Sequence, residues 1–452
     1  MKWIGSSIAL PALVAAEVTR RTMLAHFRNQ SASSRRRLPI RIALAGLLAI
    51  AAQTNLPAQT WQTVLDYQFI AGATSGAECI AADALGNVFV GGLGYPATGL
   101  SSGLVLKTDT SEATWYLSDN SNPSPPQTGS SVSGLAFGAN GNLYSAGTLW
   151  NLCTKTSCPG SFWYVRKSPD RGVTWATVDL FQSAAGKSAG SGSVAGDSLG
   201  NVFVSGGAND GNGGSHWLVR KSADGGENWA SVDDLSPGRS YGISSVPGVG
   251  LFAVGSLSST TSGKGNQSTT TRYWMVRRSV DGGAHWTTVD AYQPPAGYGA
   301  DAFAVASDAQ GKVHVAGRTT ILVGSGRTAS AVVQWLVRSS SDGGNTWSTA
   351  DAFSYVAGKG SGANGLGRDS AGTIAVVGTC IDAQGSNHWL VRRPNAQGTW
   401  QTVDDYQLAA GQTAYPNDVA ADAGGNLVVV GSANDAAGIS HWIVRRFAKS
   451  AP

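Results

Sequence analysis

The sequence has little charge, few cysteines and very few glutamates. Charged residues make up 13% of the 452 residues, and the net charge of +4 is small for this length. Such a weak and mixed charge gives no basis for nucleic-acid binding, which needs a clustered basic surface. After residue 60 the only glutamates are Glu78, Glu112 and Glu227. Few glutamates are therefore available for acid–base chemistry.

Several motifs of catalysis and ligand binding are also missing. The sequence has no Gly-x-Ser-x-Gly elbow, no phosphate-binding loop leading into a helix, and no Cys/His spacing typical of a metal site. His216, His388 and His441 each precede a repeated tryptophan. Because equivalent positions of separate repeats lie far apart, these histidines are not expected to share one metal ion. We expect neither a cofactor nor a metal.

The first 58 residues are typical of an export leader. Arginines at 35–37 and 41 precede the apolar run Ile42–Ala52, and small residues end at Ala58. A basic segment, a short apolar segment and a small residue at the cleavage point are the features of a signal peptide. Ser34–Leu38 weakly resembles a twin-arginine signal, and translation could equally start at Met23. We expect residues 1–58 to be removed, leaving an exported propeller domain at 59–452 with no membrane span.

The remaining sequence consists of repeats of about 55 residues. Glycine occurs 60 times and tryptophan 15 times, which suits short strands joined by tight turns. A Trp-x-Val-Arg strand, or a relative of it, recurs seven times, at Leu104–Lys107 and from Trp163, Trp217, Trp274, Trp335, Trp389 and Trp442. A second tryptophan opens the next strand, at Trp61, Trp115, Trp175, Trp229, Trp286, Trp347 and Trp400. This period is typical of propeller blades.

The two ends of the repeat region complement each other. The last repeat stops after Arg446 and lacks its final strand, whereas Trp61–Tyr67 closely resembles the final strand Trp400–Tyr406. An N-terminal strand that completes the last blade would close a ring and cover both exposed edges. The sequence therefore predicts an all-β fold, a seven-bladed β-propeller of four-stranded antiparallel blades closed by the strand from Trp61 onward.

A turn motif, Ser-x-Asp-x-Gly-x-x-Trp, lies between the third and fourth strands of four repeats. Its aspartates are Asp170, Asp224, Asp281 and Asp342. These turns resemble the Asp-box (BNR) repeats of a propeller superfamily that includes sialidases, xyloglucan hydrolases, sortilin-type receptors and the photosystem II assembly propeller. The resemblance covers nearly all of the chain after residue 60. It implies that the four aspartates are structural and lie away from the ligand face.

Charges that occur in nearly every repeat are first of all folding features. The set comprises Arg166, Arg220, Arg277, Arg338, Arg392 and Arg445, matched by Asp119, Asp179, Asp233, Asp290, Asp351 and Asp404. Their matching recurrence predicts Arg–Asp contacts that satisfy the charges within each blade. The alternative is a ring of arginines that binds an anionic partner.

Candidate site residues are those that break the repeat. Glu78, Asp301 and Asp418 lie where first strands begin, at the predicted mouth of the central channel, and Glu78 and Asp418 belong to adjacent blades. They are candidate catalytic carboxylates, with solvation of the channel mouth as the alternative. Aromatic residues after the fourth strands are candidates for sugar stacking, with packing as the alternative: Tyr67, Tyr292, Phe353 and Tyr406, together with Phe181.

Two segments depart from the repeat. Cys153 and Cys158 bracket a short loop and are expected to form a local disulfide after export, since no histidine lies nearby to favour a metal pair. Residues 256–271 are rich in Ser, Thr and Gly and are expected to be a linker-like loop. Cys79 and Cys380 are expected to be single buried thiols.

These observations favour an exported, monomeric, non-catalytic binding module that recognises a glycan or an extracytoplasmic protein. The first alternative is a glycoside hydrolase that uses Glu78 with Asp418 or Asp301. Ordinary sialidase chemistry is disfavoured, because it needs a glutamate beside a nucleophilic tyrosine and only Glu78 could serve. A further alternative is an assembly factor that engages a membrane complex through its arginines.

Overall fold

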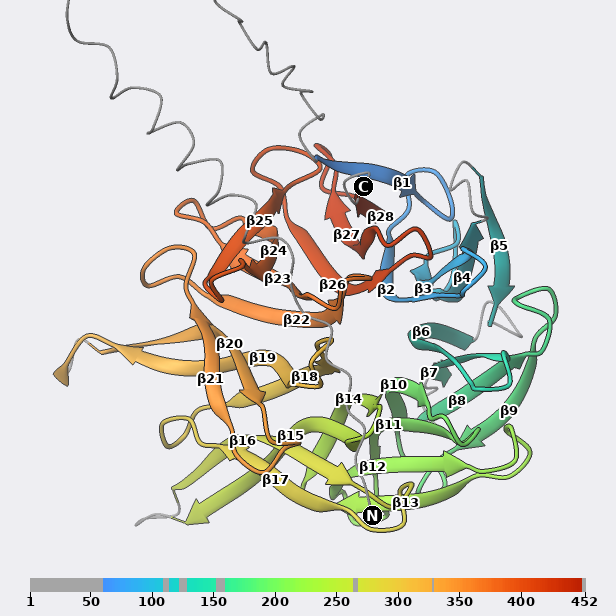
Figure 1. Cartoon of the computed structure of the whole chain (residues 1–452), viewed down its shortest axis with the longest axis horizontal. Coiled ribbons are helices and arrows are strands. Elements are labelled where there is room, and N and C mark those ends of the chain that lie inside the picture. The colour runs from blue at the N-terminus through green and yellow to red at the C-terminus, as the bar shows by residue number, and fades with distance from the viewer. Residues whose placement is uncertain are drawn as a thin grey trace, which may run out of the picture. The chain divides into compact units, whose positions relative to one another are not determined.

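Short antiparallel strands form all of the regular structure in the computed structural model. It describes residues 60–108, 114–121, 128–151, 159–262, 267–326 and 329–448. The described residues form 28 strands in seven four-stranded sheets, which lie like blades around one axis (Figure 1). None of the described residues forms a helix long and apolar enough to cross a membrane.

The blades follow one another along the chain. Blade 1 consists of β2 (Ser75–Ala82), β3 (Val88–Gly94), β4 (Ser102–Thr108) and β5 (Trp115–Asn120). Blade 2 consists of β6 (Thr128–Phe137), β7 (Leu143–Asn151), β8 (Ser161–Ser168) and β9 (Ala176–Phe181). Blade 3 consists of β10 (Ala189–Gly196), β11 (Val202–Asn209), β12 (Ser215–Ser222) and β13 (Ala230–Leu235). Blade 4 consists of β14 (Gly238–Val246), β15 (Gly250–Ser262), β16 (Ser268–Ser279) and β17 (Thr287–Tyr292).

Blade 5 consists of β18 (Ala300–Ser307), β19 (Val313–Val323), β20 (Ser330–Ser340) and β21 (Ser348–Phe353). Blade 6 consists of β22 (Ser361–Arg368), β23 (Ile374–Ile381), β24 (Asn387–Pro394) and β25 (Trp400–Tyr406). Blade 7 consists of β26 (Ala414–Ala421), β27 (Leu427–Asn434), β28 (Ser440–Phe447) and β1 (Trp61–Tyr67). The seven-bladed, all-β prediction is confirmed.

The N-terminal strand closes the ring as predicted. β1 pairs antiparallel with β28, so that Trp61 lies opposite Phe447 and Tyr67 opposite Trp442. In Figure 1 the first strand (blue) lies beside the last one (red). Each innermost strand then contacts those of its two neighbours, from β2 around to β26 and back to β2.

The packing of a tryptophan ring against a glycine of the next blade sets the distance between neighbouring blades. The tryptophans of six third strands are fully buried: Trp163, Trp217, Trp274, Trp335, Trp389 and Trp442. The ring of Trp217 lies against Gly255 on the second strand of the next blade, only 2.6 Å from where a Cβ would stand. Trp163, Trp274, Trp335 and Trp389 lie equally close to glycines of their next blades. Any side chain at these glycines would push two blades apart.

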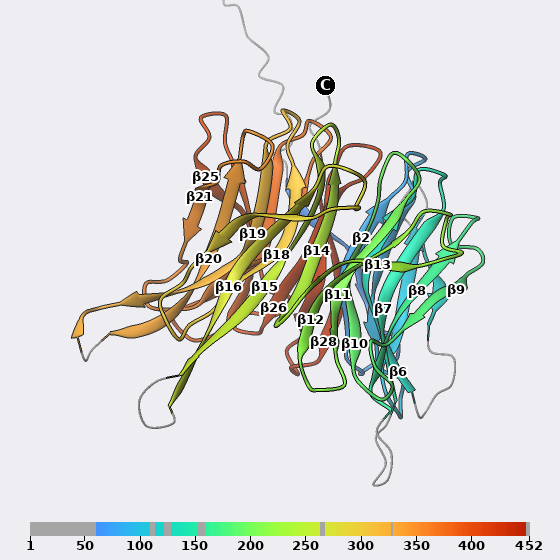
Figure 2. The same ribbon diagram turned by 90° about the horizontal axis from the view of Figure 1, so that it is seen from below.

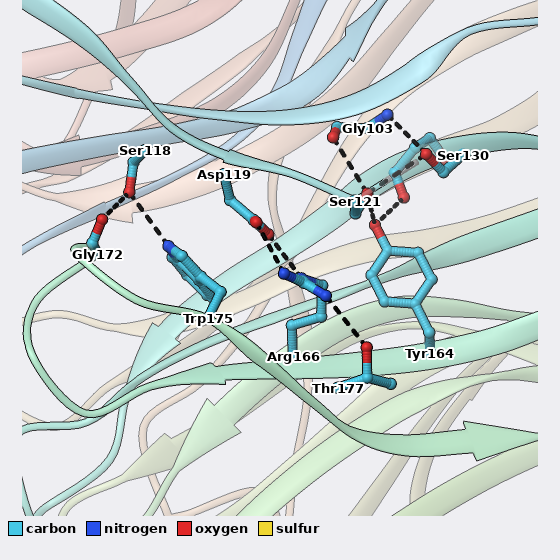
Figure 3. Close-up of polar contacts among 11 residues, drawn as sticks. Gly103, Ser118, Asp119, Ser121, Ser130, Tyr164, Arg166, Gly172, Trp175 and Thr177 are labelled. Atoms are coloured by element: carbon cyan, nitrogen blue, oxygen red, sulfur yellow. Dashed lines mark hydrogen bonds and ion pairs between the residues drawn. The ribbon is translucent and has the colours of Figure 1, made fainter. Parts of the chain in front are cut away.

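Blade 1 lacks this tryptophan and is filled from the neighbouring blade. Gly103 stands at the equivalent position of β4, because Val105 and Val165 pair with equivalent aspartates. The Tyr164 ring of blade 2 occupies the space instead, and its hydroxyl contacts Ser121 Oγ at 2.8 Å and donates to the Ser131 carbonyl at 3.0 Å (Figure 3).

The repeated arginines and aspartates pair between blades, and not within a blade as the sequence suggested. Arg166 of blade 2 donates from Nε and Nη2 to both oxygens of Asp119 in blade 1, at 2.7 and 2.9 Å (Figure 3). The same two-pronged contact joins Arg220 to Asp179, Arg277 to Asp233, Arg338 to Asp290, Arg392 to Asp351 and Arg445 to Asp404. The fourth strand of each blade faces the third strand of the next one, so its carboxylate reaches across the joint.

The joint between blades 7 and 1 has no such ion pair. Leu65 stands where the other blades have the aspartate, and Leu106 where they have the arginine, as the strand registers show. The sequence comparison had matched Lys107 with the arginines, which is wrong by one residue. Both leucines belong to the same hydrophobic cluster. An apolar pair has therefore replaced both charges together.

Residues 256–262 and 268–271 lie in paired strands and not in the linker-like loop expected from the composition of residues 256–271; residues 263–266 lie outside the described residues. β15 and β16 stay paired out to Ser262 and Ser268, and β19 and β20 are similarly long, paired out to Val323 and Ser330. These two arms, residues 257–262 with 268–273 and residues 319–323 with 330–334, project from blades 4 and 5 on the same side (Figure 2). The many Ser and Thr residues of the first arm suit a solvated ladder.

The native Leu65–Leu106 joint predicts how an ion-pair joint responds to mutation. Arg220→Leu should destabilise the protein by about 3–5 kcal/mol, because it leaves Asp179 largely buried without its cation. Adding Asp179→Leu should restore most of that stability. Urea unfolding of the two single variants and the double variant measures the coupling.

A matched control uses an exposed pair. Lys167 and Glu227 are 3.7 Å apart and the Glu227 side chain is 72% exposed, so Glu227→Leu should change stability by less than about 1 kcal/mol. If the double variant were as unstable as Arg220→Leu alone, the apolar joint would not be an equivalent solution.

Candidate functional site at the channel mouth

One bulge in each innermost strand creates a ring of seven residues. The register between first and second strands shifts at the same point in every blade, which leaves one extra residue unpaired there. The seven extra residues are Glu78, Ser133, Gly192, Tyr241, Phe303, Asn364 and Asn417. All seven line one cavity of about 560 Å³ that receives residues from every innermost strand. We call them the bulge ring.

An apolar collar lies two residues further along the same strands. It consists of Ile80, Leu135, Ile243, Val305, Leu366 and Val419, which line the cavity and are otherwise buried among the blades. The bulge ring lies nearer to the end of the propeller where innermost strands begin, which we call the entrance face. The loops between second and third strands, including the two arms, belong to this face.

Glu78 is the bulge residue of blade 1, and its side chain is exposed to the cavity. It makes no hydrogen bond or ion pair with any other residue that the structure describes. The surrounding protein keeps bulk water away, and this dehydration raises the pKa of Glu78 to about 7. Glu78 therefore exchanges a proton near neutral pH and is available to a ligand.

Asp418 lines the same cavity from adjacent blade 7, so the structure brings the two predicted carboxylates to one channel. Its Oδ2 accepts a hydrogen bond from Ile80 N at 3.1 Å, and its Oδ1 accepts one from Val419 N at 2.8 Å. Burial raises the pKa of Asp418 to about 7, against the opposing effect of these two hydrogen bonds. Both carboxylate oxygens of Asp418 thus already accept hydrogen bonds from backbone N–H groups.

Asp301 is not available at the channel mouth. It is buried, and its Oδ1 and Oδ2 accept hydrogen bonds from Arg272 at 2.5 and 2.8 Å. Arg318 donates to Oδ2 as well, at 3.2 Å. Because Arg272 lies at the base of the first arm and Arg318 near the base of the second, Asp301 joins blades 4 and 5 beneath the arms.

An aromatic wall faces Glu78. In a ring of seven, blades 4 and 5 lie across from blade 1, and their bulge residues are Tyr241 and Phe303. The two rings meet edge to face with centroids 5.2 Å apart. The Arg318 guanidinium lies 5.0 Å from the Phe303 centroid, and that of Arg239 lies 5.8 Å from the Tyr241 centroid. Sequence reasoning missed these four residues.

The aromatic candidates after the fourth strands lie elsewhere, in the packing between strands. Tyr67 lies edge-on to Trp442, Phe353 to Trp335, and Tyr406 to Trp389. The Arg338 guanidinium covers Tyr292, and Arg445 covers Tyr406. None of the four aromatics lines the channel cavity described here.

The four turn aspartates lie at the end of the propeller opposite the entrance face. In one turn Asp170 Oδ1 accepts hydrogen bonds from Thr174 N at 2.8 Å and Val173 N at 3.2 Å, and the Thr174 hydroxyl donates to Oδ2. Hydrogen bonds from Thr174 lower the pKa of Asp170 to about 2. Asp224, Asp281 and Asp342 hold their turns in the same way. The oxygens of these four carboxylates therefore accept hydrogen bonds within their own turns.

Each of the three repeated histidines lies between two aspartates on the entrance face. His216 contacts Asp234 through Nδ1 at 2.6 Å and Asp210 through Nε2 at 3.4 Å. His388 and His441 repeat the arrangement with Asp405 and Asp382, and with Asp66 and Asp435. The described residues hold no group of His, Cys, Asp and Glu suited to a metal ion. Cys79 and Cys380 are buried free thiols, whereas Cys153 and Cys158 lie outside the described residues.

No protein-family model and no curated protein matches the sequence. Solved propellers do resemble the fold. A protein of unknown function from Dyadobacter fermentans is 13% identical, with a TM-score of 0.46, over 85% of this chain and 98% of its own. YCF48 with a bound D1 peptide is 13% identical, with a TM-score of 0.44, over 86% and 97%. A GH74 xyloglucanase from Xanthomonas campestris is 13% identical, with a TM-score of 0.48, over 85% of this chain and 55% of its own. At this identity the likeness concerns the fold alone.

The raised pKa of Glu78 predicts a pH-dependent stability. A carboxyl titrates near pH 4 in the unfolded chain and at about 7 here. The unfolded state therefore releases its proton first, and the free energy of unfolding should fall as pH rises from about 4 to 7. A fully dehydrated carboxyl would contribute about 1.4 kcal/mol per pH unit, and Glu78 less because it faces the lumen.

Glu78→Gln should flatten this slope and raise stability at pH 8, measured by urea unfolding between pH 4 and 8. Asp418→Asn should also flatten it but lower stability, because an amide nitrogen would face a backbone N–H. An unchanged slope in Glu78→Gln would mean that bulk water reaches this carboxylate freely.

Proposed function

We propose that this protein is a non-catalytic binding module whose ligand occupies the channel mouth on the entrance face. The observation that carries the proposal is the bulge ring. Its members differ from blade to blade, whereas the charges repeated in six blades are paired across the joints. The bulge-ring residues that differ between blades therefore all line one cavity, where a ligand can reach them.

A glycan suits the groups in this ring. Asn364 donates its amide hydrogens to the Pro416 carbonyl at 2.9 Å and to Thr379 Oγ1 at 3.3 Å, and Asn417 donates to the Ala77 carbonyl at 2.7 Å. These bonds turn the amide nitrogens toward the blades, so the ring offers mainly acceptor oxygens. Sugar hydroxyls can donate to such oxygens while an apolar sugar face packs on Tyr241 and Phe303.

Three further assignments belong to the proposal. The hydrogen bonds of the Asp170 turn and its three counterparts support their assignment as Asp-boxes. We also propose export, on the leader-like sequence of residues 1–58, and a monomer, on the closure of the ring by β1. The arginine-mediated assembly factor receives less support, because the six repeated arginines already hold carboxylates.

Glycoside hydrolysis is the second candidate function. Glu78 and Asp418, whose pKa values burial raises to about 7, line one cavity, so either can exchange a proton at neutral pH. Against it, Asp418 uses both oxygens on backbone N–H groups, and Asp301 is held by two arginines. Glu78 is then the sole one of the three predicted carboxylates left unengaged, which suits recognition better than double displacement.

Binding should depend on the two walls of the channel. On a panel of immobilised glycans that includes xyloglucan and sialosides, Phe303→Ala and Glu78→Gln should each weaken retention about tenfold, since each removes a contact worth about 1.4 kcal/mol. Glu227→Gln is the matched control, because it removes a glutamate charge from the opposite end. The same panel is assayed for released sugar.

The outcomes separate the two candidates. Retention without release supports the binding module. Release that disappears in Glu78→Gln or Asp418→Asn would establish the glycosidase instead. Absence of both would contradict a glycan ligand and leave an extracytoplasmic protein as the proposed partner.

A further inference from the structure

Arg239 is an exception among the arginines of the propeller. The six repeated arginines, and also Arg272, Arg318 and Arg393, make ion pairs with aspartates. Arg239 makes no ion pair or hydrogen bond with any other residue that the structure describes. Its guanidinium makes a cation–π contact with the Tyr241 ring. A half-buried guanidinium with five free N–H donors is a strong attractor for an oxyanion.

Two glycines keep the space around this guanidinium open. A Cβ added to Gly190 would stand 3.5 Å from Arg239 Nη2 and 2.7 Å from Thr148 Oγ1. A Cβ on Gly207 would stand 3.1 Å from Arg239 Cγ. Side chains at either position would close the approach that the pair of glycines leaves.

The open space is a cavity of about 190 Å³ on the entrance face. Its lining residues include Arg239 and the polar residues Thr148, Ser161, Ser188, Ser215 and Asn209. His216 lines it as well, and its hydrogen bond to Asp234 raises the pKa of this imidazole. The nearby carboxylates Asp234 and Asp210 are both bound to His216 and do not line the cavity.

We infer that this cavity is an oxyanion-binding site, with Arg239 as the group that holds the charge. The volume is ample for a carboxylate or sulfate group. Arg239 supplies paired N–H donors, and the surrounding hydroxyls supply further hydrogen bonds. The ligand class is an acidic saccharide or another small molecule that carries a carboxylate or a sulfate. This cavity adjoins the channel wall through the contact of Arg239 with Tyr241 but shares no lining residue with the channel cavity, so its existence does not depend on the proposed function.

Calorimetric titration of the purified protein with defined probes tests the site. The probes are sodium glucuronate, sodium sulfate and, as the neutral reference, glucose, all at constant ionic strength. We expect at least one of the two anions to bind and glucose not to bind. Glucuronate binding alone identifies a carboxylate site, sulfate binding alone identifies a sulfate site, and binding of both identifies a general oxyanion site. Binding of neither anion would overturn the inference.

Variants of the cavity distinguish it from general attraction to a basic protein. Arg239→Gln should weaken anion binding at least tenfold, and Gly190→Ala should weaken it without any change of charge. Arg368→Gln is the matched control, since Arg368 bonds only to the carbonyls of Ser307 and Asp308, at the opposite end. Circular dichroism checks that each variant is folded, and Arg239→Lys, which keeps the charge, should bind better than Arg239→Gln. Equal losses in Arg239→Gln and Arg368→Gln would overturn the inference.

Discussion

Close contact between the blades is the constraint on which the rest of the structure depends. Five of the joints bring a buried tryptophan of one third strand onto a glycine of the next second strand, and the backbone itself becomes the packing surface. At that separation the Nε and Nη2 groups of an arginine both donate hydrogen bonds to the carboxylate on the preceding blade. The joint is thus dry, well packed and electrically neutral, which offsets the cost of burying charge. Where the tryptophan is absent, at Gly103, a tyrosine from the adjacent blade restores the contact.

The same constraint explains why the inner strands bulge. Their small residues pack directly on neighbouring backbone, as Gly365 does against Asn417 and Asp418. A large side chain has no room between two blades there, whereas the extra residue of each bulge faces the channel. Tyr241 and Phe303 are tolerated on innermost strands for this reason. Glu78 lies across the channel from these two rings because, in a ring of seven blades, blades 4 and 5 lie opposite blade 1.

The repeat in the sequence was sufficient to predict the blades, their number and the strand that closes the ring. Tryptophan spacing reports strand order directly, and the shared pattern of Trp61–Tyr67 and Trp400–Tyr406 reports closure. The pairing of charges across a joint could not be predicted in the same way. Recurrence shows that arginines such as Arg220 and aspartates such as Asp179 occur together, but it does not show whether a pair lies within one blade or between two. The Leu106 register was missed since a leucine leaves no signal at an arginine position.

The channel residues could be predicted only in part. Glu78 and Asp418 stood out as acids, but Asp301 looked the same in sequence although two arginines hold it. Tyr241 and Phe303 gave a usable signal that was overlooked, since the other five blades have Glu, Ser, Gly or Asn at that position. A comparison of repeats for their differences, after alignment on the tryptophans, would have found them. The open space beside Arg239 depends on Gly190 and Gly207 of another blade, which no local pattern reveals.

The bulge ring separates two kinds of evolutionary change. A substitution at a joint alters two blades at once and must be matched by a second substitution, as the Leu65–Leu106 pair illustrates. A substitution in the bulge ring changes one side chain that faces the lumen and leaves the ladder on either side intact. Such positions give this scaffold a repertoire of binding surfaces that single mutations can reach, except where the bulge residue itself contacts the next blade, as Asn364, Asn417 and Gly192 do. New specificities could therefore arise in this architecture without passing through unstable intermediates.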